Sequence, residues 1–237
     1  MFDLEQIIDF DKHLLLAMNG SDSLFWDGVM SVYTTTVVWI PFALALIYLL
    51  IRNNSLMNFV VLLFMLTLVM VITDGITSTI CKPLFARFRP THDPEIMYLV
   101  DIVNNYRAYK YGFMSSHAAN SFGIAVFVML LVKNKLLSFS VIIWALINCY
   151  SRIYLGVHYP GDILCGIVVG ILSGLFVYRI YSYIRDKMRS GNRGWISDNY
   201  TKSGYSVSDI HFMLMVLYAT FALIPSIAFL ILHYKFI

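Results

Sequence analysis

Residues 56–90 read LMNFVVLLFMLTLVMVITDGITSTI followed by CKPLFARFRP, an apolar run that ends abruptly in a basic, proline-containing segment. Residues 56–80 are long enough to cross the roughly 30 Å hydrocarbon core of a bilayer as one helix. Asp74 is the ionisable group inside that run, where such groups are rare. We expect it to be a structural partner for a cation or hydroxyl of a nearby site. The stretch predicts a membrane helix that carries cations to one membrane surface.

The composition of the whole chain agrees with a membrane protein. Of its 237 residues 59% are hydrophobic and only 13% are charged, with a mean hydropathy of +0.72, whereas soluble domains carry roughly a quarter charged residues. A net charge of +3 is too small to indicate nucleic acid binding. Cys81, Cys149 and Cys165 lie in or beside apolar segments, so we interpret them as packing residues and expect neither a disulfide framework nor a metal site.

Six apolar stretches follow one another near residues 26–51, 56–80, 114–132, 136–153, 162–184 and 211–233. Each is close to the roughly 20 residues that one crossing needs. Residues 3–18 alternate apolar and charged side chains and are too charged to span, which favours an amphipathic helix at the interface. The sequence therefore predicts an all-α bundle of six membrane spans with an N-terminal interfacial helix, as a single domain over residues 1–237.

Basic residues indicate the orientation of this bundle. With six spans, the N-terminus, the loop 82–113, the link 154–161 and the C-terminus share one side. That side holds eight Lys and Arg residues and the other side nine. Three of the eight are candidates for chemistry, which leaves nine against five. Because basic residues favour the cytoplasmic side, we expect the first side to face outward, in a bacterium from the inner membrane into the periplasm.

Three clusters of polar side chains lie at the ends of predicted membrane spans, where polar residues are few. The first is Lys82 and Arg89, seven residues apart, which a continued helix would place on one face. The second, Ser115-Ser116-His117, opens a span with good helix N-caps and free backbone N–H groups. The third lies between two later spans and comprises Ser151, Arg152, His158 and Asp162.

All three clusters fall on the same side of the predicted bundle, so we expect one site rather than three. Three cations, two histidines and a carboxylate suit phosphoryl transfer, in which cations hold the phosphate oxygens and neutralise developing charge. One imidazole attacks phosphorus while a carboxylate orients it, and the second imidazole protonates the leaving oxygen. No metal or other cofactor is required, because the three cations supply the positive charge.

These clusters resemble the motifs of the type 2 phosphatidic acid phosphatase family, which includes vanadium haloperoxidases and bacterial acid phosphatases. The family pattern is K-x6-R-P, then P-S-G-H, then S-R-x5-H-x3-D. Residues 82–90 and 151–162 fit the first and third elements completely. In the second element Met114 stands for the proline and Ser116 for the glycine, while Ser115 and His117 are kept. The resemblance covers about residues 25–185.

The resemblance implies a fold, an activity and a role for each matching residue. It implies hydrolysis of a lipid phosphate or pyrophosphate through a phosphohistidine, with His158 as nucleophile, Asp162 as its partner and His117 as acid. The implied phosphate-binding residues are Lys82, Arg89, Ser115, Ser116 and Arg152. The substrates open to the family include undecaprenyl pyrophosphate, lipid A, phosphatidylglycerophosphate and phosphatidic acid. Among these we expect undecaprenyl pyrophosphate, with lipid A as the next candidate, and we expect no obligate protein partner.

Other interpretations compete with this one. Taken alone, Lys82 and Arg89 fit interfacial anchors that reach the headgroups. A transporter or flippase would carry its charges along a path inside the spans, whereas here they sit at span ends, Asp74 excepted. A vanadate-dependent haloperoxidase would share the same pocket. Four charged or titratable residues of the loop are interpreted as solvated rather than catalytic: Arg87, His92, Asp93 and Glu95.

Overall fold

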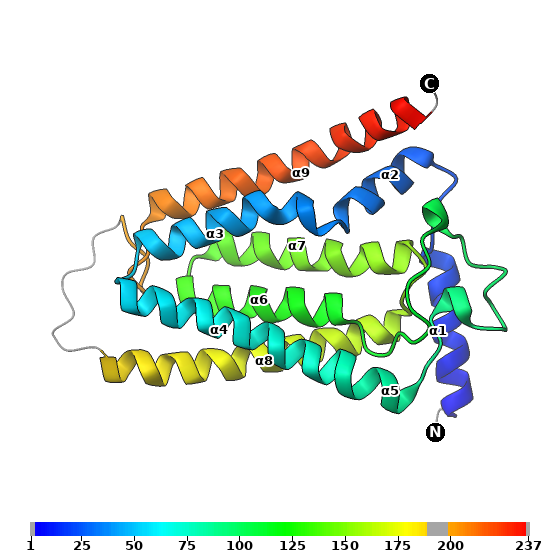
Figure 1. Ribbon diagram of the computed structural model, residues 1–237, viewed down its shortest axis with the longest axis horizontal. Coiled ribbons are helices and arrows are strands. Elements are labelled where there is room, and N and C mark those ends of the chain that lie inside the picture. The colour runs from blue at the N-terminus through cyan, green and yellow to red at the C-terminus, as the bar shows by residue number, and fades with distance from the viewer. Residues whose placement is uncertain (1–2, 189–198, 236–237) are drawn as a thin grey trace.

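The computed structural model describes residues 3–188 and 199–235, and within these ranges the chain is helical, with two isolated β-bridges and no strand. The long helices run side by side along the longest axis of the molecule (Figure 1). The all-α expectation is therefore confirmed for the described residues. The elements are α1 Leu4–Met18, α2 Leu24–Tyr33, η1 Thr36–Trp39, α3 Ile40–Arg52, α4 Leu56–Asp74, η2 Gly75–Cys81, α5 Lys82–Phe85, η3 Pro90–His92, η4 Val103–Asn105, α6 Ser116–Val132, α7 Lys135–Tyr154, α8 Pro160–Met188 and α9 Val207–Lys235.

Among the described residues, four helical stretches are long and apolar enough to cross a membrane. They are Leu56–Phe85, Lys135–Tyr154, Pro160–Lys187 and Val207–His233. A fifth crossing forms if α2 is taken together with η1 and α3 as one bent span. At 17 residues, α6 is shorter than these. The structure thus supports four to five candidate spans where the sequence predicts six.

The first predicted span, residues 26–51, is not one helix. Its two halves, Leu24–Tyr33 and Thr36–Arg52, meet at an angle of 62°. The first helix ends at Tyr33, and Thr35 is in an extended conformation. Pro41 lies in the first turn of α3, where a helix tolerates proline because the N–H groups there have no intrahelical acceptor. The break therefore falls at Thr34 and Thr35, and the chain resumes beyond them in a new direction.

Both termini, α5, the start of α6 and the link between α7 and α8 lie at one end of the bundle (Figure 1). This is the arrangement that counting spans predicts. At the same end α1 lies across the bundle, roughly perpendicular to the long helices (Figure 1). The three polar clusters of the sequence are therefore brought to one end of the molecule.

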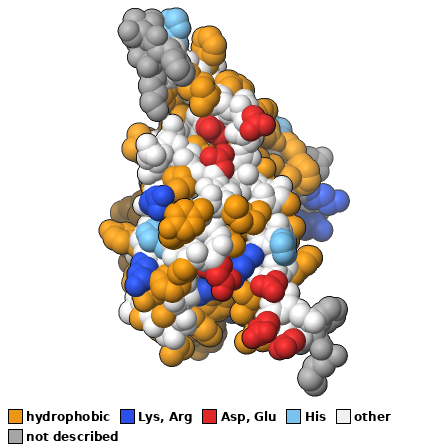
Figure 2. All heavy atoms as spheres, turned by 90° about the vertical axis from the view of Figure 1, so that its right-hand side faces the viewer, with side chains coloured by type: hydrophobic (Ala, Val, Ile, Leu, Met, Phe, Trp, Pro, Cys, Tyr) orange, Lys and Arg blue, Asp and Glu red, His pale blue; other side chains and the backbone are white. Residues whose placement is uncertain are grey.

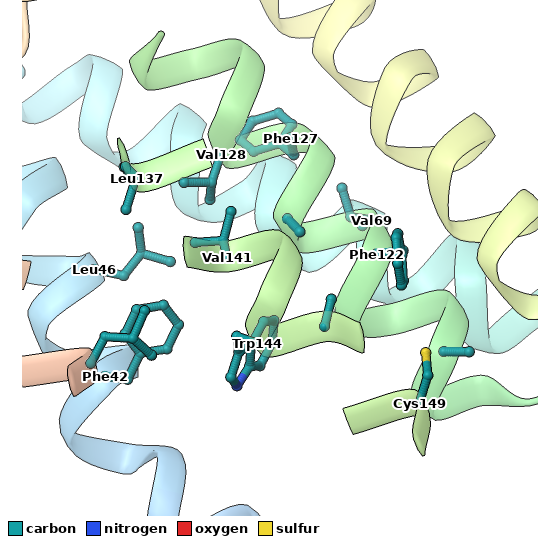
Figure 3. Close-up of a cluster of buried hydrophobic side chains, with 14 of the residues drawn as sticks. Phe42, Leu46, Val69, Phe122, Phe127, Val128, Leu137, Val141, Trp144 and Cys149 are labelled. Atoms are coloured by element: carbon teal, nitrogen blue, oxygen red, sulfur yellow. The ribbon is translucent and has the colours of Figure 1, made fainter. Parts of the chain in front are cut away.

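The centre of the bundle is an apolar core shared by α3, α4, α6 and α7, in which Trp144 and Phe127 are buried (Figure 3). Cys149 is buried in this core and Cys81 is also buried, and the three cysteines are free thiols. The expected packing role of the cysteines agrees with this placement. Packing in this core fixes the relative positions of the helices whose ends carry the polar clusters.

Close packing of α8 against α6 sets the geometry of that end. A Cβ atom added at any of three glycines of α8 would come 2.4–2.7 Å from a backbone carbonyl oxygen of α6 or of its N-cap. Such small-residue contacts let two membrane helices approach backbone to backbone. They place the first turn of α8 beside the first turn of α6. The glycines are Gly166, Gly170 and Gly174.

Candidate active site

His158 lies in the short link between α7 and α8 and is 1% exposed. Asp162 follows in the first turn of α8, where its Oδ2 accepts the backbone N–H of Tyr159 at 3.1 Å and faces His158 Nδ1 at 3.4 Å. The carboxylate assigns the proton of the imidazole to Nδ1. The lone pair of the ring therefore belongs to Nε2.

Arg89 lies directly against that lone pair. Its Nη1 donates to His158 Nε2 at 3.0 Å and to the carbonyl of Val157 at 2.8 Å, and its Nε donates to the carbonyl of Tyr111. Burial, then the positive charge of Arg152, lowers the pKa of Arg89 to about 10, so the guanidinium stays charged at neutral pH. A cation is thus within reach of the oxygens of a phosphate bound to Nε2.

The surroundings of His158 keep its ring neutral. Burial is the largest cause that lowers its pKa well below the usual value, followed by the charges of Arg89 and Arg152, with contributions from His117 and Lys82. A protonated imidazole has no lone pair for attack. The ring is therefore neutral at neutral pH, with a lone pair on Nε2.

Arg89 does not reach the site by the helical route that its spacing suggests. The helix after Lys82 ends at Phe85, and Ala86 takes a left-handed conformation with φ of 44°. The chain then runs as an extended segment, in which the N–H of Arg89 donates to the carbonyl of Lys110. The expectation of a continued helix with both cations on one face is wrong, although both cations reach the same site.

Lys82 and the serines form a second part of the site. Nζ of Lys82 donates to the hydroxyls of Ser116 at 2.5 Å and Ser78 at 2.8 Å. These contacts depend on η2, a π-helical stretch whose wider turns direct Thr77 and Ser78 toward Ser116. Interruptions of this kind often mark functional sites. The hydroxyl of Ser116, where the family pattern has glycine, thus anchors the lysine.

Ser115 and His117 flank this hydroxyl at the start of α6. Ser115 is buried and is the N-cap of α6, where its Oγ accepts the N–H of Ala118 at 3.4 Å. Its own backbone N–H donates to the carbonyl of Asp162, which ties α6 to α8. The side chain of His117 is exposed and acts electrostatically on His158. An exposed imidazole beside a buried one suits proton exchange with a substrate or with water.

Arg152 comes from the last turn of α7 and is 2% exposed. Its Nη1 donates to Thr34 Oγ1 at 2.6 Å and its Nη2 to the hydroxyl of Tyr106 at 3.4 Å. Its Nε is buried without a hydrogen-bond partner among the described atoms. An unpaired buried donor is costly, and an anion bound beside His158 would satisfy it.

The structure therefore brings together all eight residues that the sequence singles out. Figure 2 looks onto this end of the molecule, where acidic, basic and histidine side chains gather among exposed hydrophobic ones. Among the described residues, no group of three His, Cys, Asp or Glu side chains is arranged to hold a metal ion. The set is a buried nucleophilic imidazole, its carboxylate, three cations and an exposed second imidazole.

Two loop residues that the sequence interprets as solvated are not. Arg87 forms ion pairs with Asp11 and Asp162, and Asp93 accepts a hydrogen bond from the hydroxyl of Tyr159 at 2.7 Å. Their partners lie far away in the chain, so neither local spacing nor local charge identifies them. One feature of the sequence could have indicated the Arg87 contact. Asp11 lies on the predicted interfacial helix, at the same membrane surface as the loop, where an acid can pair with a loop cation.

Gly112 and Asp74 complete the surroundings. A Cβ atom on Gly112 would come 2.9 Å from Arg89 Cγ and 3.3 Å from Asp162 Oδ2, so this glycine leaves room for the nucleophile pair. Asp74 accepts a hydrogen bond from the amide of Asn120 at 3.1 Å. Asp74 also acts electrostatically on Lys82, one of the site cations. Both contacts agree with its expected structural role, and the amide of Asn120 is a partner that the sequence does not predict.

The family model and the similar proteins indicate the same family. The model of the PAP2 superfamily matches residues 58–186. A lipid A 4'-phosphatase of Bacteroides thetaiotaomicron is 38% identical over 189 residues, which cover 79% of this chain and 84% of that protein. A lipid A 4'-phosphatase of Porphyromonas gingivalis is 34% identical over 186 residues, or 78% of each chain.

A more distant relative carries another substrate name. An undecaprenyl-diphosphatase of Sulfolobus acidocaldarius is 29% identical over 169 residues, which cover 70% of this chain and 76% of that protein. No solved structure matches the chain. Because the family model spans more than half of the 237 residues and encloses all three clusters, the chain belongs to the PAP2 superfamily and is a phosphatase of that family.

Proposed function

We propose that this protein hydrolyses a phosphate monoester of lipid A, and so releases phosphate, through a phosphohistidine on His158. The observation that carries the proposal is the surroundings of His158 Nε2. This nitrogen is unprotonated, is held by a carboxylate on the opposite side of the ring and faces Arg89 at 3.0 Å. Arg152 adds a buried donor without a partner among the described atoms. A nucleophile inside a cage of cations is what attack on a phosphate dianion needs.

The reaction follows from these positions in two steps. Desolvation and the site cations disfavour a proton on His117 in the free protein, and a bound phosphate dianion offsets those charges, so His117 takes up its proton when the substrate binds. Nε2 of His158 then attacks phosphorus as the bond to the sugar oxygen breaks, and His117 gives that proton to the oxygen. Asp162 balances the positive charge that forms on the imidazole. In the second step His117, now neutral, takes a proton from a water that attacks phosphorus. Phosphate leaves, and both histidines return to their starting states.

The choice of lipid A rests on the comparisons. Two relatives that are more than 30% identical over about four fifths of this chain are named lipid A 4'-phosphatase. Undecaprenyl pyrophosphate, the first of the substrates expected above, is the second candidate, since a relative with that activity in its name is 29% identical. The two substrates differ at the leaving group, which is a sugar alkoxide in one and a phosphate in the other.

We expect purified protein in detergent to release phosphate from lipid A bearing a 4'-phosphate faster than from undecaprenyl pyrophosphate or phosphatidic acid. The physical reason is that the relatives' substrate presents a sugar monoester at the headgroup level, where His158 and His117 lie. The measurement is phosphate release at matched mole fractions in mixed micelles. A higher kcat/KM on undecaprenyl pyrophosphate would instead support the second candidate, and no release from any lipid would contradict both.

We further propose that α6 and the bent pair are both true crossings, which makes six spans, and that α1 lies in the interface. Its orientation across the bundle end supports this placement (Figure 1). Four large apolar residues on α1 are exposed and available to lipid, Leu4, Ile7, Ile8 and Phe10. With six spans, the basic residues favour an outward-facing, periplasmic active site in a bacterial inner membrane.

The orientation has its own test. In a background without the three native cysteines, Tyr109→Cys lies next to Lys110, whose carbonyl accepts the N–H of Arg89 at the active-site end. Lys202→Cys lies next to Ser203, which donates to the carbonyl of Val132 at the C-terminal end of α6, the opposite end of the bundle. Tyr109 is 91% exposed and Lys202 is exposed. We expect a membrane-impermeant thiol reagent to label the first in intact spheroplasts and the second only after permeabilisation. The reverse pattern would place the active site in the cytoplasm and rule out substrates of the outer leaflet.

The rival functions fare less well on these observations. A flippase would carry charges along the bundle, whereas the site cations gather at one end and Asp74 is held by an amide. A vanadate-dependent halide oxidation would use the same pocket, and a halide-oxidation assay with added vanadate tests it directly. We expect that assay to be negative and vanadate to inhibit phosphate release.

A further inference from the structure

Arg87 is a cation of the loop 82–113 that is bound by carboxylates beside the site. Its Nη1 donates to Asp162 Oδ1 at 2.9 Å and its Nη2 to Asp11 Oδ2 at 2.8 Å. Its guanidinium also lies over the ring of Tyr159, at 4.0 Å from the centroid. The side chain is 25% exposed, and the Asp162 side chain is fully buried. Both ends of the guanidinium fork are therefore engaged by carboxylates.

These contacts fix the orientation of Asp162. Its Oδ1 is bound by Arg87, while its Oδ2 serves Tyr159 N and His158 Nδ1. Rotation of the carboxylate would break all three contacts together. A buried carboxylate that loses its cation is driven toward its neutral form. A neutral Asp162 would no longer support the charge that develops on His158.

Arg87 is in turn held by α1. Asp11 is 9% exposed, and its Oδ1 accepts the backbone N–H of Gly161 at 2.7 Å, one residue before Asp162. A Cβ atom on Gly161 would come 2.7 Å from Asp11 Oδ2, so α1 packs closely on the start of α8. Asp11 thus bridges α1, the loop cation and the backbone beside the nucleophile pair.

We propose that Arg87 is a positioning residue for the His158–Asp162 pair and that Asp11 of α1 holds it in place. The proposal rests on the proposed function, in which His158 is the nucleophile. Arg87 acts through Asp162 and does not touch the substrate. The N-terminal helix is then part of the catalytic apparatus and not only a contact with the bilayer surface.

The test compares two arginines that lie two residues apart. Arg87→Gln should lower kcat on the order of 10²-fold, which is the usual cost of misplacing a reacting group by about 1 Å. It should leave KM and the inhibition constant of inorganic phosphate close to wild type. Arg89→Gln should raise the inhibition constant of phosphate, since Arg89 faces His158 Nε2. A weakened phosphate affinity in Arg87→Gln would overturn the proposal by making Arg87 a phosphate ligand.

A double-mutant cycle shows whether Arg87 acts through Asp162. In an Asp162→Asn background, Arg87→Gln should cost little further activity, because the group that it positions is already impaired. Losses that multiply would overturn the proposal. Arg87→Lys should recover only part of kcat, since an ammonium cannot bridge two carboxylates as a guanidinium fork does.

Neighbouring residues of α1 give a matched pair for the second half of the proposal. Asp11→Asn should lower kcat about 10-fold, since the guanidinium keeps only one of its two carboxylates. Asp9→Asn makes the same change at an exposed carboxylate of α1 and should leave kcat unchanged. Equal losses of kcat in both variants would mean that α1 matters only through its packing on the bundle, and would overturn the role of Asp11.

Two further measurements separate the possible failures. Thermal unfolding of each variant in detergent checks the fold, and losses of kcat that simply follow the unfolding temperature would contradict a positioning role. If His158→Ala stays active, the proposed function itself fails. If His158→Ala is inactive and Arg87→Gln is normal, only the present inference fails.

Discussion

Replacing His158 with alanine is expected to abolish phosphate release from every lipid substrate. Alanine offers no lone pair to phosphorus, and Asp162 and Arg89 would then flank an empty position. A nucleophile or general base contributes at least about 10²–10⁴-fold, and here the whole covalent route is lost. The measurement is turnover of purified protein under saturating substrate.

A matched control separates chemistry from folding. His13 is an exposed histidine of α1 at the same end of the molecule, and His13→Ala should retain turnover. His158→Ala should stay folded but unfold at a lower temperature than His13→Ala, because removing a buried side chain leaves a cavity and unpaired partners. Near-normal turnover of a well-folded His158→Ala protein would show that another group is the nucleophile.

Replacing His117 with alanine is expected to cost most where the leaving group is most basic. From a sugar monoester such as lipid A the departing alkoxide needs a proton, so the loss should reach the upper part of about 10²–10⁴-fold. From a pyrophosphate the departing group is a phosphate monoester whose second pKa is about 6. It can leave unprotonated near neutral pH, and the loss should be smaller.

The measurement is the ratio of wild-type to mutant rates on both substrate types under single-turnover conditions, where chemistry limits the rate. Unequal penalties in the expected order support His117 as the leaving-group acid. Equal penalties on the two substrates would reduce His117 to a phosphate-binding residue. The division of labour between the two histidines would then be wrong, while His158 could still be the nucleophile.

The convergence of the site could be predicted from the sequence because span parity constrains it. Each crossing reverses the side on which the chain emerges, so the distances in sequence between residues 82, 117 and 158 matter little. The motif spacing inside each cluster is local, and His158 and Asp162 are four apart at the start of one helix. Local spacing and parity together bring the residues to one end of the bundle.

The path of the chain between Lys82 and Arg89 could not be predicted in this way. Residues 82–85 continue the helix, and Ala86 then adopts a left-handed conformation that alanine rarely takes. What stabilises the turn is tertiary. Arg89 N donates to the carbonyl of Lys110, and Gly112 N donates to the carbonyl of Arg87. A helical wheel drawn from local spacing contains none of these contacts.

The role of Arg87 was hidden for a related reason. Its partners, Asp11 and Asp162, are 76 and 75 residues away in sequence, so the loop around it looks like any solvated basic segment. The bend in the first span is different, because it falls at Thr34 and Thr35, ahead of Pro41 in the restarted helix. Threonine is a poor helix former, and hydropathy alone ignores that local signal. The six-span count relies on hydropathy.

The central claim is that the phosphoryl group passes through His158, and one measurement tests it directly. The protein, in molar excess, is mixed with lipid A that carries a labelled 4'-phosphate. The reaction is quenched in base within a single turnover, and the protein is digested to locate the label. The account predicts label on the peptide that contains His158, appearing before free phosphate and decaying as free phosphate forms. Label on another residue, or release of phosphate with no labelled protein at any time, would contradict it.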